Sequence, residues 1–180
     1  KITCQVMEKV RDQHDEPKLN LIFSLVKKDR VFNILEKCTE LGVTCFYPIL
    51  TERTQNINYN IQKFESYVIE ASEQTRRLSI PKIMPVQKIN SLLNNWNKNE
   101  KILLCNENDG IPLMKISNNM KKSVSILIGP EGGFSEKELK EFPKFDFITS
   151  IFLGPRILRS DTAAIATIAS YQSIFGDWNL

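Results

Sequence analysis

The sequence predicts an α/β fold with a mostly parallel β-sheet flanked by helices. The apolar run LNLIFSLV, residues 19–26, is typical of a buried strand. It is followed by RVFNILEKCTELG, residues 30–42, whose apolar side chains recur at helical spacing before Gly42, a common residue at a helix end. The next run, VTCFYPIL, residues 43–50, is again strand-like. Because a strand, a helix and a strand follow one another directly, we expect a parallel unit with a right-handed crossover.

The rest of the chain continues the alternation of strands and helices. Each remaining element is predicted from the spacing of its apolar residues and from the turn residues that bound it. We expect, in chain order, a strand over residues 2–10, a turn-rich link over 11–20, a long helix over 62–77, a short helix over 89–96, a strand over 101–107, a short helix over 111–117, strands over 123–129 and 147–154, and a long helix over 161–175.

Length and composition exclude several classes of protein. The chain has 180 residues, enough for one domain with a full core, or one domain and a fragment of another. No apolar run reaches membrane-spanning length, and the N-terminus lacks the residue order of a signal peptide, so we expect a cytoplasmic protein without a membrane partner. The net charge of +3 permits a nucleic-acid partner without requiring one. Since Lys1 opens a strand-like segment, we expect the chain to be the C-terminal part of a longer protein.

The cysteines and the histidine offer no familiar catalytic or metal-binding pattern. The four cysteines are scattered, without a C-x-x-C pair, and His14 is the single histidine. A zinc site and a Ser-His-Asp or Cys-His mechanism are therefore not expected, and we predict no metal. Of the four thiols, Cys105 alone is expected near a ligand, because it ends a strand beside the motifs described next.

The segment GPEGGFSEKEL, residues 129–139, is a glycine-rich turn between a predicted strand and a predicted helix. It lacks the G-K-[ST] ending of a phosphate-binding P-loop and the G-x-G-x-x-G spacing of a dinucleotide turn. Glu131 would also repel an anion. The helix after it has a capping box, in which Ser135 is the N-cap and Glu138 follows three residues later. The turn therefore either lets backbone approach an uncharged ligand or is only a sharp corner.

A second turn of the same kind, LGPRILRSD, occupies residues 153–161. A strand again ends in Gly-Pro, Arg156 and Arg159 flank Ile157 and Leu158, and Ser160 or Asp161 is expected to cap an alanine-rich helix. If the two strands are neighbours in a parallel sheet, the two turns form one crevice at their carboxyl ends. Backbone groups there could bind an adenine edge, with apolar side chains against its ring.

The joint motif set resembles the ribosomal RNA small subunit methyltransferase E family, of the SPOUT class. It consists of IGPEGGFSEKEL and LGPRILRSDTAA, with KCTELGV and EASEQTRR upstream, and covers nearly the whole chain. The resemblance implies a sheet whose C-terminal segment forms a deep trefoil knot, S-adenosylmethionine as the cofactor, and methyl transfer to N3 of a uridine in 16S ribosomal RNA. It also implies that residues 1–13 are the remnant of a truncated N-terminal PUA-like RNA-binding barrel, and that residues 14–180 are the SPOUT methyltransferase domain.

Residue by residue, the resemblance implies a cofactor site in the crevice of the two turns. The expected cofactor-binding residues are Leu104, Cys105, Ile128, Gly129, Gly132, Leu153, Gly154, Ile157, Leu158, Arg159 and Ala163. Asp161 stands where many relatives have glutamate, a longer carboxylate.

The N3–H group of uridine is not ionised at neutral pH. Methylation at N3 therefore requires that some group accepts this proton. Arg159 or Arg156 could stabilise the negative charge on the uridine oxygens, and Glu73 or Asp161 could accept the proton. An ordinary alternative for Glu73 is a surface salt bridge with Arg77. The RNA-binding candidates are Arg76, Arg77 and Arg156.

Two functions are compatible with these motifs. The first is an S-adenosylmethionine-dependent methyltransferase of 16S ribosomal RNA or the 30S subunit, expected to be a homodimer because SPOUT sites are completed by a second subunit. The second is a ribosome-associated RNA-binding module that has kept the fold and lost methyl transfer. Titration with the cofactor separates them.

Overall fold

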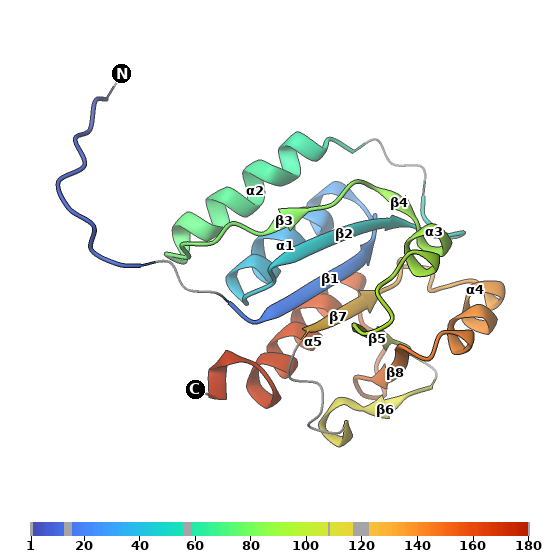
Figure 1. Ribbon diagram of the computed structural model, residues 1–180. Coiled ribbons are helices and arrows are strands. Elements are labelled where there is room, and N and C mark those ends of the chain that lie inside the picture. Colours follow the sequence, from blue (N-terminus) through green and yellow to red (C-terminus); the bar gives the residue numbers. More distant parts are fainter. Residues whose placement is uncertain (1, 13–15, 56–58, 108, 117–122, 180) are drawn as a thin grey trace.

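The fold is a parallel β-sheet with helices on both faces (Figure 1). The computed structural model describes residues 2–12, 16–55, 59–107, 109–116 and 123–179. The elements are β1 (Lys18–Ser24), α1 (Lys28–Glu40), β2 (Cys45–Leu50), α2 (Ile61–Gln74), β3 (Lys82–Ile83), β4 (Gln87–Lys88), α3 (Ile89–Asn94), β5 (Lys101–Cys105), β6 (Ile111–Pro112), β7 (Ser123–Ile128), α4 (Glu136–Glu141), β8 (Ile148–Phe152) and α5 (Ser160–Ile174), with 3₁₀ turns at Leu113–Lys115, Phe142–Lys144 and Asp177–Asn179.

The strand order across the sheet is β3-β2-β1-β7-β5-β8-β6, and β4 also pairs with β2. Every ladder among the described strands is parallel, which confirms the predicted fold class. The strands β7 and β8 both pair in parallel with β5, which lies between them. The turns that follow β7 and β8 therefore lie at the same edge of the sheet. The trefoil knot stays a prediction, because residues 117–122, just before β7, lie outside the described residues.

Side chains of the central strands alternate between two cores. In β1, Leu21 and Phe23 belong to the core beneath α1, α2 and α5, whereas Ile22 belongs to the core beneath α3 and α4. This alternation is the period of two of a β-strand with both faces covered. The near-continuous apolar run of the sequence is therefore explained by burial on both sides.

Helix α1 packs through the face that the sequence predicts. Val31, Ile34, Leu35 and Cys38 are buried, at the spacing of a 3.6-residue period. Helix α5 contacts α1 and β7 on the same side of the sheet. Among the described residues, no helix is both long and apolar enough to cross a membrane.

Helix α2 ends three residues earlier than predicted, at Gln74. Arg76 adopts a left-handed backbone with φ 57°, which a side chain rarely tolerates outside a helix end. The amide of Arg77 donates to the carbonyl of Ser72 at 2.9 Å, across that turn. This left-handed residue reverses the chain and directs Arg77 back toward the protein.

Two further expectations about local structure were wrong. Residues 2–12 form no strand; they are exposed and extend away from the sheet (Figure 1), because they find no neighbouring strand to pair with. Residues 111–117 were expected to form a helix, but Ile111–Pro112 forms β6 and a single 3₁₀ turn follows. The predicted domain boundary after residue 13, like His14, falls among residues 13–15, which lie outside the described residues, and the assignment of residues 1–13 stays a prediction.

Candidate cofactor-binding site

A cavity of about 280 Å³ lies at the carboxyl ends of β5, β7 and β8. Its walls come from the segment after β5, from the two Gly-Pro turns and from the start of α5. The lining residues are Arg53, Cys105, Asn106, Glu107, Ile128, Gly129, Pro130, Glu131, Gly133, Phe134, Glu136, Leu139, Leu153, Gly154, Arg156, Ile157, Leu158, Ser160 and Ala163. The crevice expected between the two turns is therefore present.

The first turn is held closely by its own residues. The amide of Gly133 donates to the carbonyl of Pro130 at 2.9 Å. A Cβ placed on Gly129 would lie 2.8 Å from the ring of Phe134, so this position has no room for a side chain. The capping box is formed as predicted, since Ser135 and Glu138 bond reciprocally through their side chains and amides.

Two arginines from other parts of the chain fix the first turn from outside. Arg30 of α1 forms an ion pair with Glu131. Arg53, just beyond β2, donates from Nη1 to the carbonyl of Gly132 at 2.7 Å. The carboxylate of Glu131 is thus already paired, so the sequence argument that it repels anions loses force. The missing P-loop lysine remains the stronger argument against a phosphate site.

The second turn depends on Gly154, whose φ is 113°. Residues with a Cβ rarely adopt this backbone, although open space surrounds the position. The turn leaves the side chain of Ile157 80% exposed at the wall of the cavity. An apolar side chain so exposed at a site is available for contact with a ligand or a second subunit.

The start of α5 differs from the prediction. Arg159, and not Ser160 or Asp161, is the N-cap residue, and its side chain makes no capping hydrogen bond. Ser160 is the first helical residue; its Oγ is buried at the cavity and has no hydrogen-bond partner among the described residues. A buried polar atom of this kind is suited to bonding a ligand.

The side chain of Cys105 forms part of the cavity wall. Its Sγ lies 3.2 Å from Oγ1 of Thr167 on α5. Burial raises the pKa of the Cys105 thiol to about 12, and the hydrogen bond with Thr167 only partly offsets this effect. Cys105 is therefore a neutral packing group and not a nucleophile at physiological pH.

Charges of both signs line the cavity. The cations are Arg53 and Arg156, and the carboxylates are Glu107, Glu131 and Glu136. Among the described residues Glu107 and Glu136 form no ion pair, so their charges are available to a cationic ligand. Apolar walls with carboxylates that form no ion pair suit a phosphate-free molecule that carries a positive charge.

Most residues assigned to the cofactor lie at the cavity, and three do not. Those that line it are Cys105, Ile128, Gly129, Leu153, Gly154, Ile157, Leu158 and Ala163. Leu104 is buried in the core beneath α3 and α4, because it points to the opposite face from Cys105. Gly132 directs its carbonyl to Arg53, and Arg159 is exposed outside the lining. These three residues lie outside the lining in the single chain, and their assignment to the cofactor stays a prediction.

Sequence reasoning missed several lining residues. They are Arg53, Asn106, Glu107, Phe134, Glu136, Leu139 and Ser160, whereas Pro130, Glu131 and Gly133 belong to the turn that was expected to form the wall. A signal for Arg53 was available, since it follows the carboxyl end of β2 and parallel strands end at one edge of the sheet. The others belong to segments already assigned to the crevice, and their side-chain directions could not be read from spacing.

Glu73, Arg76 and Arg77 lie at the opposite edge of the sheet from the cavity. Glu73 is the penultimate residue of α2, and the two arginines follow the end of this helix, before the amino end of β3 (Figure 1). Glu73 does not line the cavity of its own subunit, and its expected role as a base stays a prediction. Arg76 is exposed and accepts a hydrogen bond at its carbonyl from Arg11 at 2.7 Å, which leaves its side chain free for the predicted RNA contact.

Arg77 has a structural role. Its Nη1 donates to the carbonyls of Thr39 and Val43, at 2.5 and 3.0 Å, and its Nη2 pairs with Glu16. Only 9% of the side chain is exposed. Two predictions are corrected here, because the guanidinium is not available to RNA phosphates and its ionic partner is Glu16, not Glu73.

Asp161 joins α5 to α1. Asn33 Nδ2 donates to its Oδ2 over 3.5 Å, and Oδ1 is buried with no partner among the described residues. Asp161 does not line the cavity. Among the described residues, no three His, Cys, Asp or Glu side chains are grouped so as to hold a metal ion.

Comparison with known proteins assigns the chain to a family. The sequence model of a protein family, described as an RNA methyltransferase domain, matches residues 14–172. The ribosomal RNA small subunit methyltransferase E of Rickettsia conorii is 31% identical over 175 residues, which cover 95% of this chain and 70% of that protein. The chain belongs to the ribosomal RNA small subunit methyltransferase E family.

Solved structures agree with this assignment. The family member from Neisseria gonorrhoeae, determined with S-adenosylmethionine bound, has a TM-score of 0.83 at 30% identity, covering 90% of this chain and 68% of that one. The SpoU methyltransferase AviRb from Streptomyces viridochromogenes has a TM-score of 0.58 at 15% identity, covering 91% and 61%. The second likeness supports the SPOUT-type fold, and the first provides a cofactor-bound relative of the family.

Proposed function

We propose that this chain is an S-adenosylmethionine-dependent methyltransferase that modifies 16S ribosomal RNA of the small subunit at N3 of a uridine. The observation that carries the proposal is the cavity between the two Gly-Pro turns, in a chain whose family includes a cofactor-bound structure. A substrate in the 30S subunit would place the protein in the cytoplasm.

The residues at the cavity fit this cofactor. Cys105, Ile128, Leu153 and Leu158 provide walls for the adenine and ribose, and Gly129 lets the ring of Phe134 pack against the first turn. The buried Oγ of Ser160 is available for a hydrogen bond. When bound, S-adenosylmethionine supplies the methyl group and a sulfonium charge that the nearby carboxylates favour.

Arg156 is the leading candidate to stabilise the uridine after loss of its N3 proton. Both Arg156 and Arg159 are exposed in the single chain, but only Arg156 lines the cavity. A guanidinium beside a developing oxyanion lowers the barrier most where water is excluded. Arg53 is the other cation at the cavity, but its Nη1 is already bonded to Gly132.

Glu107 is the leading candidate to accept the N3 proton. It lines the cavity beside the first turn, since its Oε1 lies 3.5 Å from a Cβ placed on Gly133. Glu136 also lines the cavity, but from the first turn of α4, and it is the second candidate. Asp161 does not line the cavity, and its hydrogen bond with Asn33 suits a role in positioning the start of α5 against α1.

We also propose that the active form is a homodimer. The exposed side chain of Ile157 leaves the cavity open on one side, as expected if a second subunit covers it. Light scattering of the purified chain tests the dimer. Ile157→Glu should produce monomers with weaker cofactor binding, and a wild-type monomer with full activity would contradict this proposal.

The function is tested by incubating the chain with labelled S-adenosylmethionine and 30S subunits from cells that lack the gene. We expect one methyl group in 16S ribosomal RNA, located on one uridine by mass mapping. Isothermal titration with the cofactor distinguishes the alternative, because a module that only binds RNA would take up no S-adenosylmethionine. Cofactor binding without methyl transfer to either 30S subunits or free 16S RNA would refute the proposed substrate.

A further inference from the structure

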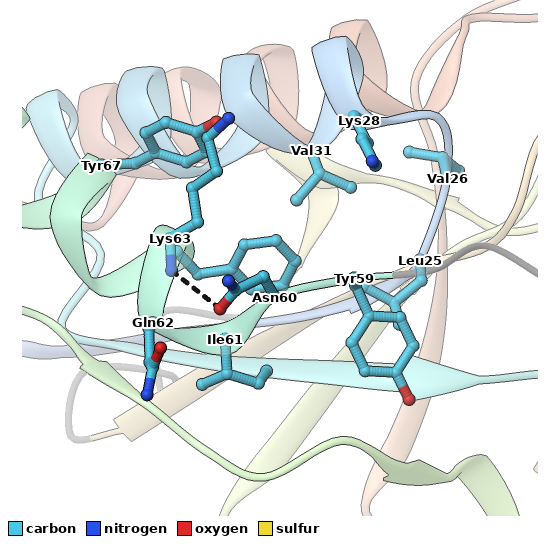
Figure 2. A pocket seen from close by; sticks show the side chains of 11 residues that line it. Leu25, Val26, Lys28, Val31, Tyr59, Asn60, Ile61, Gln62, Lys63 and Tyr67 are labelled. Atoms are coloured by element: carbon cyan, nitrogen blue, oxygen red, sulfur yellow. Dashed lines mark hydrogen bonds between the residues drawn. The ribbon is translucent and has the colours of Figure 1, made fainter.

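A second cavity, of about 620 Å³, lies between the amino ends of α1 and α2. Figure 2 shows Lys28 and Val31 of α1 on one side of it, with Tyr59 and Ile61 on the other. Its lining residues are Leu25, Val26, Lys28, Val31, Tyr59, Asn60, Ile61, Gln62, Lys63, Phe64 and Tyr67. None of them belongs to the cofactor cavity.

The lining combines an apolar floor, aromatic rings and positive charge. Val31 and Phe64 are buried, whereas the side chain of Tyr59 is 38% exposed. In the described part of the chain no other ring packs against Tyr59, so a face of it is open to a planar ligand. The charged residues of the lining are Lys28 and Lys63, both cationic and both exposed.

This combination suits an unpaired nucleotide of RNA. Single-stranded nucleic acid is bound by bases stacked on aromatic rings and by phosphates near lysine or arginine. Lys63 already lies over the ring of Tyr67, with its Nζ 5.7 Å from the centroid, which holds one cation at the wall. The side chain of Gln62 at the start of α2 also lines the cavity and offers polar groups to a base edge, while the Oδ1 of Asn60 caps the helix by accepting from the amide of Lys63.

The cavity is also placed beside the cofactor site. Leu25 and Val26 directly follow β1, and β1 is the neighbour of β7, whose end leads into the first Gly-Pro turn. Two residues after Lys28, Arg30 pairs with Glu131 in the wall of the cofactor cavity. The first turn of α1 therefore contributes Lys28 to this cavity and, through Arg30, an ion pair to the wall of the cofactor cavity.

We propose that this cavity, defined by Lys28, Tyr59, Lys63 and Tyr67, binds an unpaired nucleotide flanking the methylated one. The inference rests on the proposed function in that the substrate is RNA. Tyr59 stacks on the base, and Lys28 and Lys63 contact the phosphates on either side. The site is separate from the arginines considered above for RNA binding.

The test measures binding of a fluorescein-labelled single-stranded oligouridine to the chain by anisotropy. Tyr59→Ala and the double variant Lys28→Glu, Lys63→Glu should each weaken binding about tenfold or more. Replacing both lysines by alanine should lower the salt dependence by about one counterion for each lysine. Trp178→Ala and Lys98→Glu, at exposed residues outside the lining of this cavity, are the matched controls and should bind as wild type.

Two further readouts distinguish a nucleotide site from general attraction of RNA to a basic surface. Oligouridine carrying 4-thiouridine should crosslink to the peptide that contains Tyr59, and the crosslink should be lost in the lysine double variant. Cofactor titration of each variant should remain at the wild-type affinity. If the wild-type chain binds S-adenosylmethionine but the variants bind RNA normally, the cavity proposal is wrong while the proposed function stands.

Failure of the proposed function would look different. A wild-type chain that binds no S-adenosylmethionine, yet loses RNA affinity in these variants, would retain the nucleotide site and refute the methyltransferase. Absence of any oligouridine binding at low salt would overturn the cavity proposal. A shift of the monomer–dimer equilibrium in the variants, with RNA affinity unchanged, would also overturn it and assign the cavity to a protein contact.

Discussion

Arg30 on α1 and Glu131 in the turn after β7 form an ion pair that joins the helix to the wall of the cofactor cavity. The two side chains are 17% and 32% exposed, so the pair is partly shielded from water. The charge of Arg30 neutralises the carboxylate of Glu131, which by itself would repel an anion from the GPEGG turn. The same contact connects the turn with the helix that lines the second cavity.

Breaking this pair should weaken cofactor binding. In Glu131→Gln the partly buried Arg30 loses its partner and the turn loses an external contact, so we expect S-adenosylmethionine affinity to fall about tenfold, or about 1.4 kcal/mol. Isothermal titration measures the change. Glu141→Gln is the control, because it removes a surface pair with Lys144 and should leave affinity unchanged. Equal affinities for the two variants would show that the pair does not shape the site.

Arg156→Ala should lower kcat about 100- to 1,000-fold, the usual effect of removing one oxyanion-stabilising group. Cofactor affinity should change little, because the role of Arg156 is at the uridine. Arg159→Ala is the comparison and should have the smaller effect, since its side chain lies outside the cavity lining. Steady-state methylation of 30S subunits measures both. A loss confined to Arg159→Ala would return the role to Arg159.

Glu107→Gln should lower kcat strongly while the cofactor still binds, if Glu107 accepts the N3 proton. Asp161→Asn should have a smaller effect on kcat, because the amide can still bond Asn33 and the side chain lies outside the cavity lining. Single-turnover methylation across a range of pH separates the two roles. The roles would be reversed if Glu107→Gln stayed active and Asp161→Asn lost the rise of the methylation rate with pH on the acidic side of the profile.

Gly154→Ala should destabilise the fold by about 1–3 kcal/mol, because alanine is strained at a φ of 113°. The second turn should also shift, which would reduce cofactor affinity. Urea unfolding and isothermal titration measure the two effects. Gly132→Ala is the control: its Cβ would meet only the Arg53 side chain, at 3.7 Å, so we expect near-wild-type stability. The strain argument fails if both variants unfold at the same urea concentration.

Cys105 should resist alkylation at neutral pH. Its pKa is raised to about 12 by burial, so the thiolate needed for reaction is scarce below that pH. A variant with Cys105 as its single cysteine should react slowly with iodoacetamide at neutral pH. The rate should increase as the pH is raised, and bound S-adenosylmethionine should lower the rate at any given pH. A variant with exposed Cys4 alone is the control. Rapid, cofactor-independent alkylation of Cys105 at pH 7 would contradict its position in the wall.

The same pKa shift has a consequence for stability. Since the folded protein holds the Cys105 proton more tightly than the unfolded chain, the stabilisation from this group is complete below the ordinary thiol pKa. It is lost as the pH rises from there toward about 12. Cys105→Ser, which does not titrate in this range, should show a flatter decline of unfolding free energy at alkaline pH.

The sequence by itself determined the central strands and the long helices, and it indicated where the candidate site lies. Apolar runs and helical spacing locate the central strands and the long helices, because the burial of each element requires its own period. The two Gly-Pro turns could be paired from the sequence, since parallel strands end at one edge of the sheet. The family motifs identified the cofactor, which no periodicity could provide.

The tertiary structure alone decided which neighbouring side chains reach the cavity. Cys105 lines it and Leu104 does not, because adjacent residues of a strand point to opposite faces. Arg77 is occupied inside the protein because the left-handed Arg76 turns the chain inward. Arg30 meets Glu131, which is distant in the chain, only when α1 packs beside the end of β7. Such contacts depend on the packing of distant segments, and local sequence patterns carry no information about them.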